Sequence, residues 1–348
     1  MTHRIQQKET PCPEGVITLF TITNARDATV ELSTLGAGIT RITVHDKEER
    51  LTDVVLSYDK AEDYFRDSPC AGKTPGRFAN RIAGAEFSID GTTYHLTRND
   101  GPNTLHGGPG GFHNRIWDYE IIERGVRFTR LSPDGEEGYP GNLQAAVTYR
   151  WNDDCSLDIS YEARTDAPTV VNLTNHAYFN LNGCGSGDIL RHLLTLNCRT
   201  RVQSDASDIP TGAILPVEGT PFDFRSPKEI GRNINEDFEN LATGKGYNHY
   251  FIIDPADGEG LTRAATLYGP LSGIRLDVDT DMPGLMLYTG NWLDGSPAGA
   301  GGLVYRDHDG VAIECQFPPD APNRPDFPST LLRPGETYRR AVRYTFSR

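Results

Sequence analysis

The amino-acid sequence predicts an all-β protein, a large antiparallel β-sandwich with few short helices. Several segments alternate apolar and polar residues, which is the period of a half-buried strand, and helical periodicity is scarce. The 36 glycines and 23 prolines are spread along the chain, as many short strands joined by turns require. We find no linker or internal repeat, and therefore expect a single domain over residues 1–348. A length prior of roughly 150 residues per domain would suggest two, but large all-β domains often exceed it.

The strand pattern is clearest in four segments. In each of them apolar side chains recur at every second position and polar or small side chains fill the positions between: 145–151, 157–163, 274–278 and 342–346. Such alternation predicts strands with one face toward the core and the other toward solvent. The strand order is not readable from the sequence.

A hairpin is predicted around Asp90-Gly91. Asp-Gly supplies the positive φ values that a type I′ turn requires, and the flanking apolar residues alternate: Phe87, Ile89, Tyr94 and Leu96. We expect two short helices elsewhere, over about residues 59–65 and 226–234.

The excess of acidic residues disfavours anionic partners. The formal net charge is −14 and the pI is about 5.1. An acidic chain of this kind argues against nucleic acid or an anionic membrane surface as a partner. It also disfavours a strongly anionic substrate, whereas a neutral small molecule is compatible with it.

The lack of a secretory signal and of a long apolar run, together with the cysteine spacing, leads us to expect a cytoplasmic protein. The N-terminal residues lack the apolar stretch of a secretory signal, and no run approaches the roughly 20 apolar residues of a membrane span. The six cysteines show no metal-ligand spacing, so we expect reduced thiols. The oligomeric state is left open between a monomer and a homodimer.

Cofactor motifs are missing from the sequence. Gly72-Lys73-Thr74 resembles the end of a P-loop, but Asp67 stands where the first glycine of that motif belongs. There is no HExxH, no GxSxG and no GxGxxG strand–helix unit. We therefore expect neither a metal nor an organic cofactor.

Four segments contain polar and aromatic residues that strand formation alone does not require. They lie at 76–82, 103–108, 172–180 and 313–323. Within them, His176 has a side chain that can give and take a proton near neutral pH. Glu314 lies in an otherwise apolar run, where burial would raise its pKa toward the range of a general base. Arg81 offers a fixed positive charge and planar donors for sugar oxygens.

Each of these residues also has a structural interpretation. His176 could be an ordinary buried histidine, and Glu314 could be ion-paired with Arg77 or Arg81. Asn103 is typical of a backbone-capping turn, and His106, beside two glycines, is compatible with a plain turn. His113 and His308 have no partner pattern, so we expect them on the surface.

Taken together and in this order, the four clusters resemble the aldose 1-epimerase (galactose mutarotase) family. The resemblance extends from about residue 14 to residue 347 and includes five further segments: 132–141, 209–212, 222–225, 288–291 and 332–336. It implies a large twisted β-sandwich of the galactose mutarotase type. It also implies an enzyme that interconverts the α and β anomers of a free aldose such as glucose or galactose, with the sugar in an open cleft.

The resemblance also implies roles for individual residues. Glu314 is implied as the catalytic base and His176 as the catalytic acid. The residues implied to bind the sugar are Asn80, Arg81, His106, Tyr178 and Asn248.

Two positions depart from the family pattern. The family usually has an aspartate that binds a sugar hydroxyl where this chain has Asn248, and a neutral hydrogen bond is weaker than a charged one by roughly 1 kcal/mol. Some relatives have a glutamine where this chain has Met286. Both changes leave the acid–base pair intact, so we expect the chemistry to be retained and the sugar preference to be shifted away from galactose.

Three other functions remain as alternatives. A hexose-6-phosphate epimerase-like enzyme would need an added cationic pocket for the phosphate, which the net charge disfavours. A non-catalytic carbohydrate-binding module would bind sugar without turnover. A glycoside hydrolase would need a second carboxylate roughly 5 to 10 Å from Glu314, and the sequence offers no clear candidate.

Overall fold

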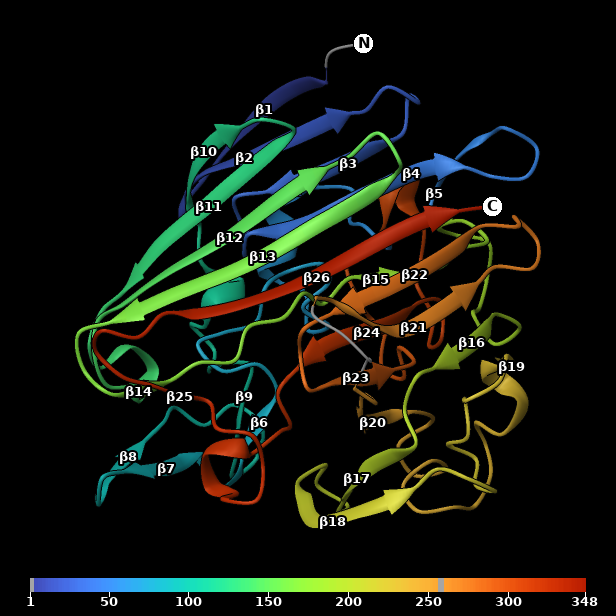
Figure 1. Cartoon of the computed structure of the whole chain (residues 1–348). Helices are drawn as coiled ribbons and strands as arrows, with labels where there is room; N and C mark the ends of the chain where they lie inside the picture. Colours follow the sequence, from blue (N-terminus) through green and yellow to red (C-terminus); the bar gives the residue numbers. More distant parts are fainter. Residues whose placement is uncertain (1–2, 256–259) are drawn as a thin grey trace.

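The computed structural model describes residues 3–255 and 260–348, and the predicted all-β fold is confirmed. The three largest sheets have nine, six and five strands. Figure 1 shows the long strands β11, β12, β13 and β26 running side by side, with β23 and β24 below them. The strands paired within these sheets are antiparallel throughout the described part of the chain.

The nine-stranded sheet forms one layer of the sandwich. Its strands, in spatial order, are β10 (Asp118–Ile122), β11 (Gly125–Ser132), β12 (Leu143–Trp151), β13 (Ser156–Thr165), β26 (Tyr338–Ser347), β22 (Arg275–Thr280), β21 (Thr262–Tyr268), β16 (Leu193–Leu196) and β19 (Lys228–Glu229). The C-terminal strand β26 pairs with both β13 and β22, so it joins segments that are far apart in sequence.

The six-stranded sheet faces part of that layer and carries the site described below. Its order is β15 (Tyr178–Phe179), β24 (Val311–Gln316), β23 (Gly284–Tyr288), β20 (Asn248–Ile252), β17 (Thr200–Ser204) and β18 (Pro210–Pro216). The N-terminal sheet contains, in order, β1 (Arg4–Cys12), β2 (Gly15–Thr23), β3 (Thr29–Ser33), β4 (Gly38–His45) and β5 (Leu51–Asp53).

Smaller elements complete the fold. The two-stranded sheets are β14 (Thr169–Val170) with β25 (Leu331–Leu332), β6 (Arg81–Ile82) with β9 (Thr104–Leu105), and β7 (Glu86–Ile89) with β8 (Thr92–His95). The helical segments are single 3₁₀ turns: η1 (Ala61–Phe65), η2 (Ala83–Ala85), η3 (Phe112–Asn114), η4 (Glu136–Gly138), η5 (Ile230–Arg232), η6 (Ala300–Gly302) and η7 (Ala321–Asn323). No helix in the described ranges has the length and apolar character that a membrane crossing needs.

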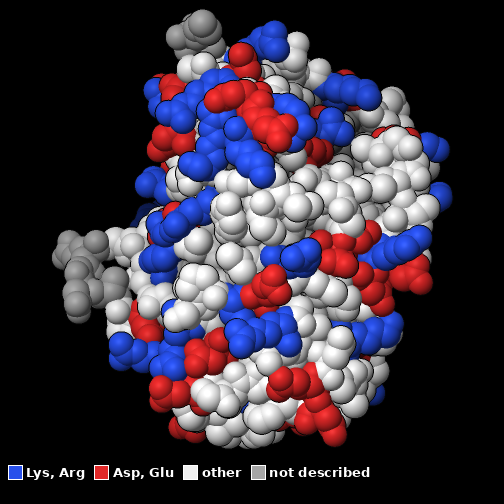
Figure 2. Space-filling model, turned by 90° about the vertical axis from the view of Figure 1, so that its right-hand side faces the viewer, with Lys and Arg blue, Asp and Glu red and all other residues white. Residues whose placement is uncertain are grey.

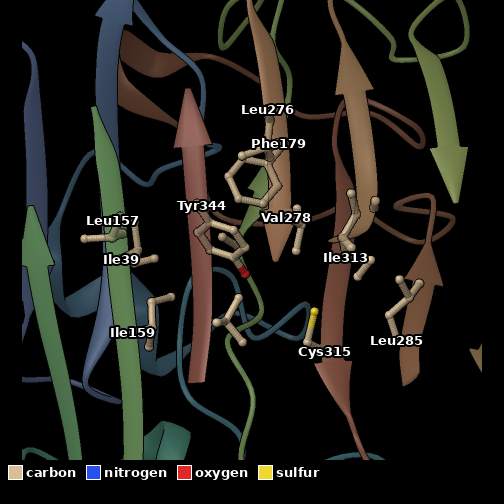
Figure 3. Close-up of a cluster of buried hydrophobic side chains, with 14 of the residues drawn as sticks. Ile39, Leu157, Ile159, Phe179, Leu276, Val278, Leu285, Ile313, Cys315 and Tyr344 are labelled. Carbon is tan, nitrogen blue, oxygen red and sulfur yellow. The ribbon is translucent and has the colours of Figure 1, made fainter. Parts of the chain in front are cut away.

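The largest hydrophobic cluster lies between the sheets. Figure 3 shows Leu157 and Ile159 of β13 and Tyr344 of β26 on one side of this core, with Ile313 and Cys315 of β24 on the other. These five side chains are at most 1% exposed. The interdigitated apolar faces hold the two sheets together, because burial of apolar surface is the main favourable term in folding.

The predicted strands are confirmed, with one difference in burial. In β13 the apolar positions are buried and the polar ones partly exposed. In β12, however, Ala146 and Thr148 are also buried, with 6% and 7% exposure. They are short side chains registered beside the longer Arg127 and Glu162 of the neighbouring strands, which shield them from solvent.

The predicted hairpin is confirmed and the predicted helices only in part. Asp90 and Gly91 have φ values of 52° and 82° and connect β7 to β8. The helix expected at 59–65 is η1. The longer helix expected over 226–234 is wrong, because Lys228 and Glu229 form β19 at the edge of the nine-stranded sheet and only η5 follows.

The surface carries charges of both signs. The face shown in Figure 2 mixes Lys and Arg with Asp and Glu, and uncharged areas lie between them. No extended field of positive charge covers this face.

Candidate active site

Strand register gathers the site on the face of the six-stranded sheet that is turned away from the core. Along β24, Ile313 and Cys315 enter the core, so Glu314 between them projects to the opposite face. Met286 of β23 lies directly opposite Glu314. Tyr178 and Asn248 lie on the same face, because Tyr178 pairs with Ala312 and Asn248 with Tyr288.

Glu314 and His176 form the centre of this face. The Nε2 atom of His176 is 3.5 Å from Oε1 of Glu314, and their side chains are 5% and 2% exposed. The other carboxylate oxygen of Glu314 has no hydrogen-bond partner within the described ranges. A nearly buried carboxylate beside an imidazole, with one oxygen uncommitted, is suited to proton transfer.

The backbone around His176 is held by the segment that precedes the first polar cluster. The N–H of His176 donates to the carbonyl of Lys73 at 2.9 Å, and the N–H of Gly72 donates to the carbonyl of His176 at 2.8 Å. The side chain of Asn175 donates to the Gly72 carbonyl at 2.7 Å. These bonds fix the position of the imidazole, whose ring also packs against Tyr178 at 5.0 Å between centroids.

Burial moves the pKa values of the pair in opposite directions. Burial raises the pKa of Glu314 to about 8, while the positive charge of Arg81 partly lowers it. Burial lowers the pKa of His176 to about 4, and the charge of Lys73 adds to that lowering. Each shift favours the neutral form of its group, as expected where water is excluded. Over the neutral range the pair therefore holds a single titratable proton.

Two further histidines lie next to His176. The ring of His106 is 5.4 Å from that of His176, and the ring of His113 is 6.4 Å from that of His106. Nδ1 of His106 accepts a hydrogen bond from the backbone N–H of Asn80 at 3.2 Å, so it is the acceptor nitrogen of a neutral ring. Burial lowers the pKa of His106 well below its usual range and that of His113 to about 3.

The expectation of a surface position is wrong for His113, whereas His308 is half-buried. His113 is 9% exposed and lies in η3, which packs its histidine toward the site. Nδ1 of His308 is 2.8 Å from the carbonyl oxygen of Thr289, which ties its half-buried ring to the loop after β23. Neither contact has a signal in the local sequence, since each partner is distant along the chain.

Arg81 lies at the partly exposed edge of the site, and its side chain is 15% exposed. Its Nε donates to Asp100 at 2.7 Å, and a terminal nitrogen is 3.5 Å from Oδ2 of Asp208. The neighbouring Asn80 is 4% exposed and uses its side-chain oxygen to accept the N–H of Arg81 at 2.8 Å. Arg81 therefore brings a positive charge toward Glu314, yet is itself neutralised by two carboxylates.

The alternative in which Glu314 is ion-paired with Arg77 is wrong. The Arg77 guanidinium is 2% exposed and donates instead to the carbonyls of Pro140, Gly141 and Ser132. Within the described ranges Arg81 does not form a direct ion pair with Glu314 either, because its guanidinium pairs with Asp100 and Asp208.

The structure thus brings together all seven residues expected at the site, and adds some that the sequence did not indicate. Asn248 donates through its amide to Oδ2 of Asp208 at 2.8 Å. Asp208 was not expected, because it lies in a turn that carries no recognisable motif. Gln316, two residues after Glu314 on β24, is fully buried, and neither atom of its amide has a partner in the described part of the chain.

Comparison with known proteins agrees with this arrangement. A family model described as "Aldose 1-epimerase" matches residues 18–345. A galactose mutarotase of Rattus norvegicus is 41% identical over 339 residues, covering 97% of this chain and 96% of the relative. The galactose mutarotase of Homo sapiens is 42% identical and covers 91% of each chain. An aldose 1-epimerase of Escherichia coli (strain K12) is 38% identical, covering 97% of this chain and 98% of the relative.

Solved structures are similar over the whole chain. A GalM/aldose epimerase homologue from C. elegans superposes with a TM-score of 0.86 at 33% identity, and a galactose 1-epimerase from Lactobacillus acidophilus NCFM with a TM-score of 0.84 at 27% identity. Each similarity covers 99% of both chains. The fold, the family model and the relatives agree from one end of the described chain to the other, and the chain belongs to the aldose 1-epimerase family.

Proposed function

We propose that this protein is a mutarotase that interconverts the α and β anomers of a free aldose without a cofactor. The observation that carries the proposal is the buried Glu314–His176 pair, with 3.5 Å between Oε1 and Nε2, in a chain 41% identical to a galactose mutarotase. Opening a pyranose ring requires one group that takes a proton from the anomeric hydroxyl and another that gives a proton to the ring oxygen.

The two residues can supply both transfers. The Glu314 carboxylate accepts the proton of the hydroxyl on C1 while His176 protonates the ring oxygen O5. The C1–O5 bond breaks, and C1 becomes the carbonyl carbon of the open-chain aldehyde. After rotation about C1–C2, His176 takes the proton back from the O5 hydroxyl and Glu314 returns its proton to O1. The ring closes on the other face of C1, which gives the other anomer.

The proton count of this cycle matches the electrostatics of the site. The pair holds one proton throughout, on His176 before opening and on Glu314 after it. The pKa values of about 8 and about 4 favour the arrangement with the proton on Glu314, and the value for Glu314 already includes the effect of Arg81. The positive charge of Arg81 works in the other direction, because it lowers the pKa of Glu314. Transfer of the proton from Glu314 to His176, across the 3.5 Å between Oε1 and Nε2, therefore precedes ring opening.

The surrounding residues are suited to bind a neutral sugar. We assign hydroxyl contacts to His106, Arg81 and Asn248, which are partly exposed. Asn80 and Tyr178 lie nearer the catalytic pair. The backbone N–H of Asn80 donates to His106. Tyr178 packs its ring on that of His176, and its hydroxyl donates to the Pro69 carbonyl at 3.0 Å. A phosphorylated sugar is less suitable, because Arg81 is already paired with two aspartates.

Polarimetry tests the proposal directly. Freshly dissolved α-D-glucose, α-D-galactose, L-arabinose and D-xylose are followed with and without the protein. We expect an approach to anomeric equilibrium whose rate is proportional to protein concentration for at least one of these sugars. No acceleration over the spontaneous rate for any of them, together with acceleration for glucose 6-phosphate, would overturn the free-sugar assignment.

The shared proton also predicts a bell-shaped pH profile. Below the His176 pKa of about 4 the pair gains a second proton and loses its base, and above the Glu314 pKa of about 8 it loses its last proton and its acid. We expect kcat/KM to be level between these limits and to fall about tenfold per pH unit beyond each of them. Initial rates corrected for the buffer-catalysed reaction give the profile. A rate that stays constant past both limits would contradict the one-proton pair.

A further inference from the structure

Asp208 is a carboxylate at the site to which the mechanism above gives no task. It lies at the end of a tight turn between β17 and β18, where its N–H donates to the carbonyl of Asp205 at 3.0 Å. The side chain of Asp205 caps the same turn by accepting the N–H groups of Ser207 and Ile209. Asp208 has a left-handed φ of 58°. The turn is therefore fixed by its own hydrogen bonds and does not depend on the Asp208 side chain.

That side chain points toward the edge of the proposed sugar site. Its Oδ2 accepts a hydrogen bond from Nδ2 of Asn248 at 2.8 Å and lies 3.5 Å from a terminal nitrogen of Arg81. The Asp208 side chain is 29% exposed, and that of Arg81 15%. A carboxylate, an amide and a guanidinium thus meet at one partly open point, supplied by three separate segments of the chain.

The point where they meet lies within reach of a sugar bound at Glu314. Asn248 is on the same sheet face as Glu314, two strands away and in register with Ala312, two residues before it, which is roughly 12 Å at the usual strand spacing and rise. Arg81 is near both ends of this distance. It contacts Asp208, and its charge acts on Glu314. A pyranose held with C1 and O5 at the catalytic pair would extend its remote hydroxyls in this direction.

We propose that Asp208 is a sugar-binding residue, whose carboxylate accepts a hydrogen bond from a hydroxyl of the aldose away from the reacting C1–O5 bond. The inference rests on the proposed mutarotase function and adds to it the residue that supplies charged recognition. Asn248 positions Asp208 through one N–H, and keeps its own amide oxygen and second N–H for the same or a neighbouring hydroxyl. The charged acceptor at this edge of the site is then located on the β17–β18 turn, while β20 provides the neutral amide.

A purely structural role for Asp208 would operate through Arg81. Asp100 provides the comparison, because it makes the shorter contact with the same guanidinium, at 2.7 Å, and has a similar side-chain exposure of 32%. If Asp208 only held Arg81 in place, removing the Asp100 charge should be at least as harmful as removing that of Asp208.

The test measures kcat and KM by polarimetry, and sugar affinity by calorimetry, for the wild type, D208N and D100N. We expect D208N to lower kcat/KM about 10- to 100-fold, as loss of one charged hydrogen bond does, mainly through KM. D100N is expected to have the smaller effect. With singly deoxygenated aldoses, the ratio of wild type to D208N should fall to near one for the sugar that lacks the contacted hydroxyl and persist for the others.

Exchanging the two side chains provides a second test. N248D places a carboxylate beside Asp208, so like charges at about 2.8 Å should weaken sugar binding. The double variant D208N/N248D restores one carboxylate and one amide, and should bind sugar better than N248D alone. Thermal unfolding checks that each variant is folded.

The outcomes separate the inference from the function on which it rests. A wild type that turns over free aldoses, with D208N within twofold of it on every sugar, overturns the role of Asp208 alone. The role is also overturned if D208N lowers kcat/KM equally for all deoxygenated sugars and D100N does the same. That pattern would mean that both aspartates act by holding Arg81 in place. A wild type that neither turns over nor binds any free aldose overturns the proposed function, and the inference falls with it.

Discussion

Replacing Glu314 with glutamine is expected to lower kcat for mutarotation about 10²- to 10⁴-fold, the range attributed to one general base. The amide has nearly the same size as the carboxyl, so the 2% exposed site can hold it without repacking. It cannot accept the proton of the anomeric hydroxyl, however. Because the sugar contacts proposed for Arg81 and Asn248 are left in place, KM should change much less than kcat. Initial polarimetric rates over a range of sugar concentrations separate the two.

The stability of this variant distinguishes lost chemistry from lost folding. The folded-state pKa of Glu314 is about 8, against an ordinary value of 4.5, so the folded state binds the proton more tightly than the unfolded chain. This group therefore contributes stability that is present below pH 4.5 and lost as pH rises through about 8. Glutamine has no such dependence. Between pH 5 and pH 8 the Tm of the wild type should fall more than that of E314Q.

A carboxylate on the outer sheet face provides the control. Glu162 of β13 is 42% exposed and lies in the nine-stranded sheet, whereas Glu314 lies in the six-stranded sheet, so E162Q should keep the wild-type rate. If E314Q retained more than a tenth of the wild-type kcat while remaining folded, Glu314 would not be the general base.

Replacing His176 with glutamine is expected to lower kcat by a comparable 10² to 10⁴, since it removes the group proposed to protonate the ring oxygen. The ring of His176 packs against those of Tyr178 at 5.0 Å and His106 at 5.4 Å, so some loss of stability is also expected. The kinetic signature is specific. The break near pH 4, assigned to the His176 pKa of about 4, should be absent in H176Q, and the residual rate should follow the deprotonation of Glu314 alone.

His192 is a matched control for the loss of a buried imidazole. It is fully buried and accepts the N–H of Leu181 through Nε2 at 3.0 Å, but it lies outside the site. H192Q should therefore lower Tm while kcat stays within a few-fold of the wild type. The double variant E314Q/H176Q should be scarcely slower than either single variant, because residues that act as a unit lose their effect together. Additive losses would mean that the two residues act independently.

Local patterns were enough to predict the strands and the hairpin. The period-two alternation around Leu157 and the Asp90-Gly91 turn are short-range signals, which depend on a few neighbouring residues. Glu314 was recognisable because a charge within an apolar strand calls for an explanation. Its partner His176 was expected from the family resemblance, and the two are 138 positions apart in the sequence.

Features that depend on distant pairing could not be predicted in this way. The order of the nine-stranded sheet places β26 between β13 and β22, and no local signal specifies that choice. His113 looked like a surface residue because its contact with the ring of His106 is made by folding η3 onto the site. Asp208 had no signal in the local sequence, since its partners Asn248 of β20 and Arg81 of β6 are distant along the chain.

The alternation along β24 has a consequence for how this protein can change. All six residues of the strand are buried. Every position therefore contributes to either the sandwich core or the site, and a substitution at any of them would affect one or the other. Inserting or deleting one residue here would exchange the two faces, sending the catalytic carboxyl into the hydrocarbon interior and an isoleucine toward the sugar. Changes of sugar preference should therefore be tolerated better at the half-exposed perimeter, where Asn248 and Asp208 lie, than along β24.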